Sequence, residues 1–398
     1  MKTLMNWLVL VTISVIIVVI TTIGLNLFLD KKIKVLTEEK DIRVLGKQCF
    51  DVIKDKSSLD KKIFSDKDYL FMLGSSELGI SVPQNPMDFY PFKDGDYNLT
   101  SFGRPFVQSL QHTTYLGGGD LKPNQKVVFM LSIQWFEKIN AVKSDYFANN
   151  FSEVQFYKFM ENPKISEENK KYYAERVYDF LSTAKKYQGE AYYAKLYLDA
   201  STYSNVQKIV LNPYYEIKKY ILDTQDKALI YNKLKELPNK KNEQKLREIN
   251  WNEEYTKIEK ENENIVSTNQ FNLEDKSYNI NLKDKIDKHK DEYKDISIMK
   301  SKEMDDYKFL LSVCKDLGIK PYIVVQPVNG WFYDFAGLDK DQRDEWSNTV
   351  TKIAKDNNFE VLDLHGYDYK KYFLIDRQHL GKEGWLKVDE GIYKYFNK

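Results

Sequence analysis

Short, continuous apolar runs alternate with helical apolar stripes in two separate parts of this 398-residue chain. The runs are Tyr69–Leu73 and Lys126–Ile133 in the first part, and Tyr322–Val325 and Phe359–Leu364 in the second. Runs without alternating polar positions are typical of parallel strands buried on both faces, and the stripes between them are typical of the covering helices. The chain is therefore predicted to form an α/β fold with a doubly wound, mostly parallel sheet.

The stretch between these two parts has a different composition. It combines amphipathic helical patterns with long runs of charged and amide side chains, which are typical of solvated helix faces. Residues 150–299 are accordingly predicted to form a mostly helical insertion. Residues 68–149 and 300–398 are predicted to form the α/β catalytic domain together.

The amino-terminal residues form a third kind of segment. Thr3 to Leu29 carries no charge and is dense in Val, Ile and Leu, and a helix of this length spans roughly 30 Å, the thickness of a bilayer core. No small-x-small cleavage site follows it, so residues 1–30 are predicted to be an uncleaved transmembrane anchor and residues 31–67 a membrane-proximal stalk. Three lysines follow the run, against one lysine and the terminal amine before it, which favours a cytoplasmic domain.

The overall charge and the cysteine content exclude several classes of function. Sixty basic residues balance 59 acidic ones, whereas general nucleic-acid binders carry a basic excess. The two cysteines, Cys49 and Cys314, form no disulfide framework and have no metal-ligand spacing, although a bond between them stays open. No metal or cofactor is predicted.

Two short motifs carry the chemistry. Gly74-Ser75-Ser76 follows the first apolar run, and such a strand-to-helix turn lifts a serine clear of a sheet and points backbone N–H groups at it. Alone, this turn is more often a plain loop. Near the carboxyl terminus, Asp376 precedes His379 by three residues, a spacing that lets the carboxylate orient the imidazole for taking a serine proton.

The two motifs together resemble the SGNH/GDSL hydrolase family. Against that family's Gly-Asp-Ser block, Gly74-Ser75-Ser76 makes Ser76 the nucleophile, and the Asp-x-x-His block matches Asp376 and His379. The resemblance implies oxyanion donors at Ser76 and Gly103. The family's Gly-x-Asn-Asp block is absent, and Gln134, after the second run, stands in its place as a third donor.

A narrower resemblance rests on five segments that follow the apolar amino terminus. They are Gly-Ser-Ser-Glu-Leu, Gln-Ser-Leu-Gln-His, Ser-Ile-Gln-Trp-Phe, Gln-Pro-Val-Asn-Gly and Asp-Arg-Gln-His-Leu. Together they resemble the DltD family of membrane-anchored teichoic acid D-alanylation proteins over essentially the whole chain. This implies a single-pass protein of the cell membrane of a Gram-positive bacterium, with its catalytic domain outside the cell. The distribution of lysines around the anchor favours the opposite orientation.

The same resemblance implies an activity and partners. The activity is transfer of D-alanine onto lipoteichoic or wall teichoic acid through a Ser-His-Asp triad. The partners are the membrane O-acyltransferase DltB, the small protein DltX and, through DltB, the carrier protein DltC. Arg104 and Arg377 flank two of the motifs and are predicted to bind acceptor phosphates, with structural ion pairs as the alternative. Two other functions stay open: a tethered non-catalytic scaffold and an O-acetyl esterase of cell-wall polymers.

Overall fold

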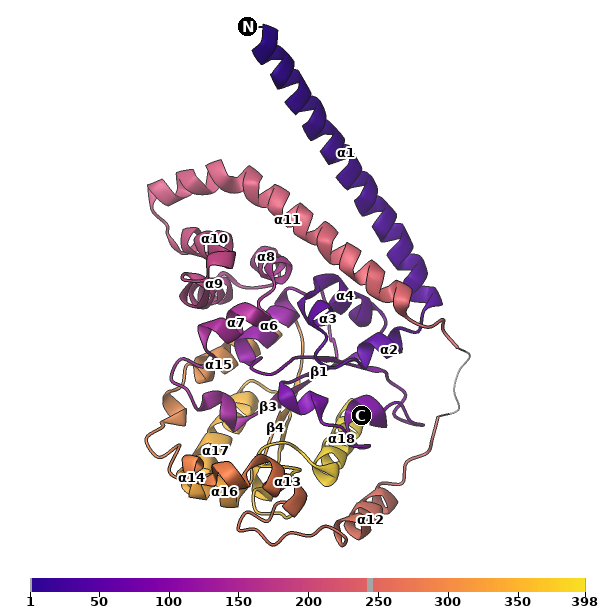
Figure 1. Cartoon of the computed structure of the whole chain (residues 1–398), viewed down its shortest axis with the longest axis vertical. Helices are drawn as coiled ribbons and strands as arrows, with labels where there is room; N and C mark the ends of the chain where they lie inside the picture. The colour runs from indigo at the N-terminus through magenta and orange to yellow at the C-terminus, as the bar shows by residue number, and fades with distance from the viewer. Residues whose placement is uncertain (1, 242–245, 398) are drawn as a thin grey trace.

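The centre of the molecule is a five-stranded parallel sheet (Figure 1), seen in a computed structural model that describes residues 2–241 and 246–397. The strands are β1 (Leu70–Leu73), β2 (Leu99–Phe102), β3 (Val127–Leu131), β4 (Tyr322–Val325) and β5 (Val361–Asp363). They pair in the order β2-β1-β3-β4-β5, and every pair is parallel. The predicted α/β class with a parallel sheet is confirmed, and strand β2 is an addition to the four predicted runs.

Helices cover both faces of the sheet. Alternate strand residues divide between two apolar clusters, so that Phe71 and Phe129 belong to one and Met72 and Met130 to the other. The first face packs under α6 (Ser109–Gly117), α15 (Glu303–Asp316) and α17 (Lys340–Asp356), and the second under α5 (Pro86–Phe89) and α18 (Lys382–Phe396). Every residue of β1 and β3 is buried, as the continuous apolar runs require.

The region between β3 and α15 is mostly helical, in agreement with its composition. Its helices are α7 (Ser144–Asn150), α8 (Glu153–Glu161), α9 (Glu167–Leu181), α10 (Gln188–Leu198), α11 (Thr202–Glu236), α12 (Trp251–Asn262), α13 (Asp275–Asn281) and α14 (Ile286–His289). Helix α16 (Gly330–Phe335) follows β4. Helix α8 packs on α6, while the 35-residue helix α11 lies across α8 and α4 (Ser58–Asp66) and contacts the lower part of α1 (Figure 1).

The predicted anchor falls on α1 (Lys2–Glu39). Most side chains before Ile20, and residue 1 altogether, lie outside the described part of the chain. Among the residues that are described, no helix is long and apolar enough to cross a membrane. The anchor at residues 1–30 stays a prediction.

The predicted stalk is also helical, and its second half joins the body of the protein. It contains α2 (Ile42–Gly46), α3 (Val52–Lys56) and α4. Phe64 and the charged side chains of Lys54, Asp55, Asp60 and Lys61 are fully buried there. The Lys54 and Lys61 ammonium groups donate to backbone carbonyls there, and their positive charges oppose the rise in the Asp55 pKa that burial causes. The two cysteines, 49 and 314, are both free.

Candidate active site

The sheet order places the serine turn at a natural binding position. Successive strands are added on one side of β1 and then on the other, so the connections after β1 and β3 leave a crevice beyond their carboxyl ends. Ser76 begins the short 3-10 helix η1 (Ser76–Gly79) directly after β1, and Gln134 lies in η2 (Ile133–Phe136) after β3. The sequence motifs therefore meet at the edge where ligands bind in sheets of this type.

Ser76, His379 and Asp376 form one continuous hydrogen-bonded chain. The Ser76 hydroxyl lies 2.9 Å from Nε2 of His379, across 303 residues of sequence. Nδ1 of His379 lies 2.7 Å from Oδ2 of Asp376. The other carboxylate oxygen accepts the backbone N–H groups of Gln378 and His379 at 2.8 and 2.9 Å. The aspartate thus fixes both the loop and the ring, as the Asp-x-x-His spacing predicted.

The environment favours a charged aspartate and a basic histidine. Burial opposes ionisation of Asp376, but its hydrogen bond to His379 and the two backbone N–H groups hold the pKa of the carboxyl below its usual value. Burial also opposes a charge on His379, but the hydrogen bond and negative charge of Asp376 outweigh this and raise the pKa of the imidazole above 6.5. Such a histidine can accept the serine proton.

Ser75 and Glu77 hold the turn on either side of Ser76. The Ser75 hydroxyl donates to the backbone oxygen of Arg104 at 3.1 Å, and its N–H donates to Oε1 of Glu77 at 2.7 Å. Both side chains are buried; Ser75 and Ser76 both line the pocket, but only the Ser76 hydroxyl is hydrogen-bonded to His379. Burial raises the pKa of Glu77 above its usual value, although the Ser75 N–H opposes this. These contacts give Ser75 a structural position and leave Ser76 to face the histidine.

The three predicted oxyanion donors are placed differently. Ser76 and Gln134 both line the pocket. Gly103 lies behind the turn, where a Cβ would come within 1.8 Å of the Gly74 carbonyl oxygen at a φ of +142°. Its N–H points to Oδ1 of the buried Asp55 at 3.4 Å. The geometry therefore does not support Gly103 as an oxyanion donor, and it shows instead why this position is glycine.

The two predicted phosphate-binding arginines do not line the pocket. Nε of Arg104 lies 3.2 Å from the fully buried carboxylate of Asp55, which matches the structural ion pair left open as the alternative. Burial raises the pKa of Asp55 to about 6, while the Lys54 and Arg104 charges oppose the shift. Arg377 lies with its guanidinium 5.4 Å from the centre of the Phe332 ring, and its carbonyl accepts the Asn329 N–H at 2.9 Å.

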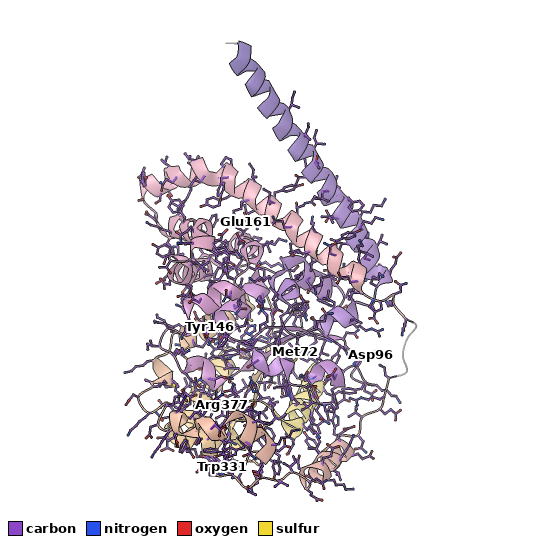
Figure 2. All side chains as sticks on the ribbon, viewed as in Figure 1. Met72, Asp96, Tyr146, Glu161, Trp331 and Arg377 are labelled. Carbon is purple, nitrogen blue, oxygen red and sulfur yellow. The ribbon has the colours of Figure 1, made fainter. Side chains whose placement is uncertain are left out.

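The pocket in front of Ser76 has a volume of about 350 Å³. One wall is a pair of aromatic rings, Phe106 and Tyr146, stacked with their centres 3.8 Å apart. The other groups with charge at this pocket, besides His379, are Glu137, Lys138 and Lys143. Figure 2 labels Tyr146, which lines the pocket, and Arg377, which does not.

Glu137 is a feature that the motif comparison missed. It caps η2, and burial raises the pKa of its carboxyl to about 7, against the nearby charge of Arg377. A half-buried carboxylate at the wall of this pocket can bind a cationic group. The only sequence signal was its place three residues after Gln134, in a segment that follows a strand.

The other polar side chains considered for the site do not line this pocket. Asp363, after β5, lies 2.8 Å from Nδ1 of His365 and accepts a hydrogen bond from Ser347. Gln326, after β4, is buried. His112 is fully buried against Phe129 and Trp135, and burial lowers its pKa to about 3, so it is neutral. Within the described residues, no group of three or more His, Cys, Asp and Glu side chains is placed to hold a metal ion.

Comparisons with known proteins agree with the segment resemblance. The family model described as DltD protein matches residues 46–397. Protein DltD of Bacillus subtilis (strain 168) is 28% identical over 340 residues, which are 85% of each chain. Protein DltD of Staphylococcus aureus (strain NCTC 8325 / PS 47) is 24% identical over 361 residues, 90% of this chain and 89% of that one. Protein DltD of Lacticaseibacillus rhamnosus is 26% identical over 349 residues, 82% of this chain and 77% of that one. The chain therefore belongs to the DltD family.

Proposed function

We propose that this protein is a serine acyltransferase that moves D-alanine from an ester or thioester donor onto hydroxyl groups of teichoic acid, outside the cell membrane. The observation that carries the proposal is the hydrogen-bonded chain from Ser76 through His379 to Asp376, which opens on a pocket. Membership of the DltD family supplies the substrate class.

The first half of the reaction loads the serine. Ser76 Oγ attacks the D-alanyl carbonyl carbon while its proton passes to Nε2 of His379. Asp376 stabilises the imidazolium that forms. The Ser76 N–H, with the Gln134 side-chain amide, faces the oxygen that becomes negative. The bond to the donor oxygen or sulfur then breaks, and His379 returns the proton to that leaving group.

The second half transfers the acyl group. A teichoic acid hydroxyl gives its proton to Nε2 of His379 and attacks the acyl carbon. The ester bond to Ser76 breaks, and the serine oxygen recovers the proton. Water would give hydrolysis by the same steps, so the aromatic wall of Phe106 and Tyr146 serves this proposal by limiting the access of water to one side of the pocket.

The charges at the pocket fit the two substrates. D-Alanine carries an ammonium group, and Glu137 is the pocket carboxylate that can pair with it. Teichoic acid is a polymer of phosphodiesters, and the exposed ammonium groups of Lys138 and Lys143 stand at the same pocket. In this proposal these lysines take the role that the sequence suggested for Arg104 and Arg377. The proposed partners remain DltB, DltX and DltC.

A fluorophosphonate probe, which reacts with activated serines, tests whether the hydrogen-bonded chain activates Ser76. The intact chain should be labelled at Ser76, and Ser76→Ala and His379→Ala should both abolish labelling. In a transfer assay with teichoic acid, Ser76→Ala should lower the rate by about 10³-fold or more. Unchanged transfer by Ser76→Ala would refute the enzyme and favour a scaffold. Turnover of acetyl esters without turnover of D-alanyl esters would favour the O-acetyl esterase.

A further inference from the structure

The first half of helix α11 exposes a continuous apolar face. Its large apolar side chains recur every three or four residues, and Ile209 and Ile217 are 75% and 64% exposed. Six of them are Val206, Ile209, Val210, Tyr214, Ile217 and Ile221. At 3.6 residues per turn they occupy an arc of about 140°. An exposed apolar face of this size on a folded protein indicates an interaction surface.

The same helix has a second face that packs on the body. Ser204 and Tyr215 are buried, and Leu211 and Leu222 pack against the core. Tyr215 contacts the Tyr193 ring of α10, with the ring centres 4.9 Å apart. Because the helix is already docked along this side, the outward apolar face is not needed for folding.

The position of helix α1 beside α11 indicates what the outward apolar face contacts. The lower part of α1 packs against α11, where Asn26 donates to the Thr224 hydroxyl at 3.0 Å and Phe28 contacts the ring of Tyr231. From this base the two helices diverge, and α11 curves away across the body (Figure 1). Pro213 lies inside α11, about a third of the way along it, where a proline bends a helix.

The side chains of α1 that stand beyond this base are also apolar. Ile17, Ile20 and Ile23 are exposed, within the run from Thr3 to Leu29 that carries no charge. Helices α1 and α11, which diverge from a shared base, therefore both expose apolar side chains. Tyr203 and Tyr220, near the two ends of the α11 face, have the amphipathic rings that favour the boundary between lipid and water.

We infer that residues 203–221 of α11 lie in the surface of a lipid bilayer, as a second attachment beside α1. The apolar side chains enter the boundary between head groups and acyl chains, while the opposite face of the helix stays packed on the body of the protein. This attachment would fix the catalytic body at one height and tilt above the membrane. The inference does not rest on the proposed function, because it concerns contact with lipid rather than chemistry.

Lipid quenching of a single fluorophore tests this inference. The test uses the full chain with Cys49 replaced by serine and the buried Cys314 retained. The variant Ile209→Cys then provides the site for an environment-sensitive dye. Asn212→Cys is the matched control, because Asn212 is exposed on the same helix about 130° away from the centre of the apolar face. Each protein is reconstituted in vesicles of phosphatidylcholine and phosphatidylglycerol, with and without lipids that carry a nitroxide near the head of the acyl chain.

The expected result is quenching at position 209 at least about twofold stronger than at position 212. Ile217→Cys, two turns further along the same face, should match position 209 and guards against a local effect of one substitution. Equal or absent quenching at 209 and 212 would overturn the inference. Disulfide-linked dimers through position 209 without lipid quenching would also overturn it, and would assign the face to a second copy of the chain.

Discussion

The proposed reaction depends on His379, because its two ring nitrogens have different partners. Nδ1 faces the Asp376 carboxylate at 2.7 Å and Nε2 faces the Ser76 hydroxyl at 2.9 Å. Only the neutral ring can accept the serine proton. The raised pKa of His379 therefore makes activity fall when the pH drops through that value, which lies above 6.5.

Replacing Asp376 by asparagine should change both the rate and its pH dependence. The Asp376→Asn variant lacks the negative charge that raises the pKa of His379, so the acid limb of the rate profile should move to lower pH. The maximal rate should fall by about 10³- to 10⁴-fold, since the amide neither stabilises the imidazolium nor selects the active tautomer. Ester hydrolysis measured from about pH 5 to about pH 9 checks this. An acid limb that stays in place would contradict the assigned pair.

Gly103 gives a prediction for stability rather than chemistry. Alanine at this position would place its Cβ 1.8 Å from the Gly74 carbonyl oxygen, at a φ of +142°. We expect Gly103→Ala to lower the free energy of unfolding by about 3 kcal/mol or more. Gly366→Ala is the control, because a Cβ there meets nothing within 4 Å. Its change should stay within about 0.5 kcal/mol in urea unfolding. Equal effects of the two variants would show that the turn relaxes freely.

At the scale of elements, the segment from η2 to α7 forms one wall of the pocket. It contributes Glu137, Lys138, Lys143 and Tyr146 to the pocket, while the turn after β1 and the loop before α18 contribute Ser76 and His379. In the proposed function, the reacting groups and the groups that bind substrate therefore belong to different parts of the chain. Substitutions in the wall should change substrate preference without removing the nucleophile.

Glu137→Gln tests the ammonium end of the pocket. The variant keeps the shape and loses the charge, so kcat/KM for D-alanyl esters should fall about 10-fold or more. The value for acetyl esters, which lack an ammonium group, should change by less than about twofold in the same assay. Equal losses on both substrates would mean that Glu137 supports the structure of the site rather than the recognition of D-alanine.

The lysines test the acceptor end. The double variant Lys138→Gln and Lys143→Gln should reduce transfer to teichoic acid about 10-fold at low salt, and the deficit should shrink as salt screens the phosphates. Hydrolysis of a small ester should be unchanged. Lys355→Gln, an exposed lysine on α17, is the matched control. A deficit that is independent of salt would argue against phosphate binding by these lysines.

At the scale of the whole molecule, helix α11 connects the amino-terminal helices to the body. Oδ2 of Asp226 on α11 accepts the backbone N–H groups of Ser58 and Leu59, at the first turn of α4, at 2.9 and 3.0 Å. Asp51, before α3, forms an ion pair with Lys233. Because α3 and α4 carry the buried charges behind Gly103, α1, α11 and the serine turn share one connected framework.

The variant Asp226→Ala should therefore destabilise the protein more than the variant Asp223→Ala, which changes a more exposed residue of the same helix. The Asp226→Ala variant leaves one buried and one partly buried N–H group without this acceptor, which costs about 2–3 kcal/mol. Asp223→Ala removes partly exposed ion pairs with Lys158 and Lys227 and should cost less than about 1 kcal/mol. Chemical unfolding of the two variants gives the comparison, and a smaller effect for Asp226 would contradict the connection described here.

Local sequence was enough to predict the sheet class and to identify the two motifs that meet in the structure. The runs that became β1, β3 and β4 are apolar at every position, and that pattern is a property of a few adjacent residues. Strand β2 was missed because Thr100 and Ser101 interrupt its apolar pattern, although both are buried between neighbours. The Asp-x-x-His spacing likewise encodes a contact within one loop, between Asp376 and His379.

Tertiary structure alone decided which distant groups meet. The parallel crossovers bring Ser76 to His379 across 303 residues, place Glu137 at their pocket, and turn the Gly103 N–H toward Asp55 instead of toward substrate. No pattern in adjacent residues reports these pairings, because they depend on strand order and on the burial of charges from separate helices. The sequence by itself thus determined the kinds of element and the candidate reactive groups, and the packing of those elements determined their partners and the charges around them.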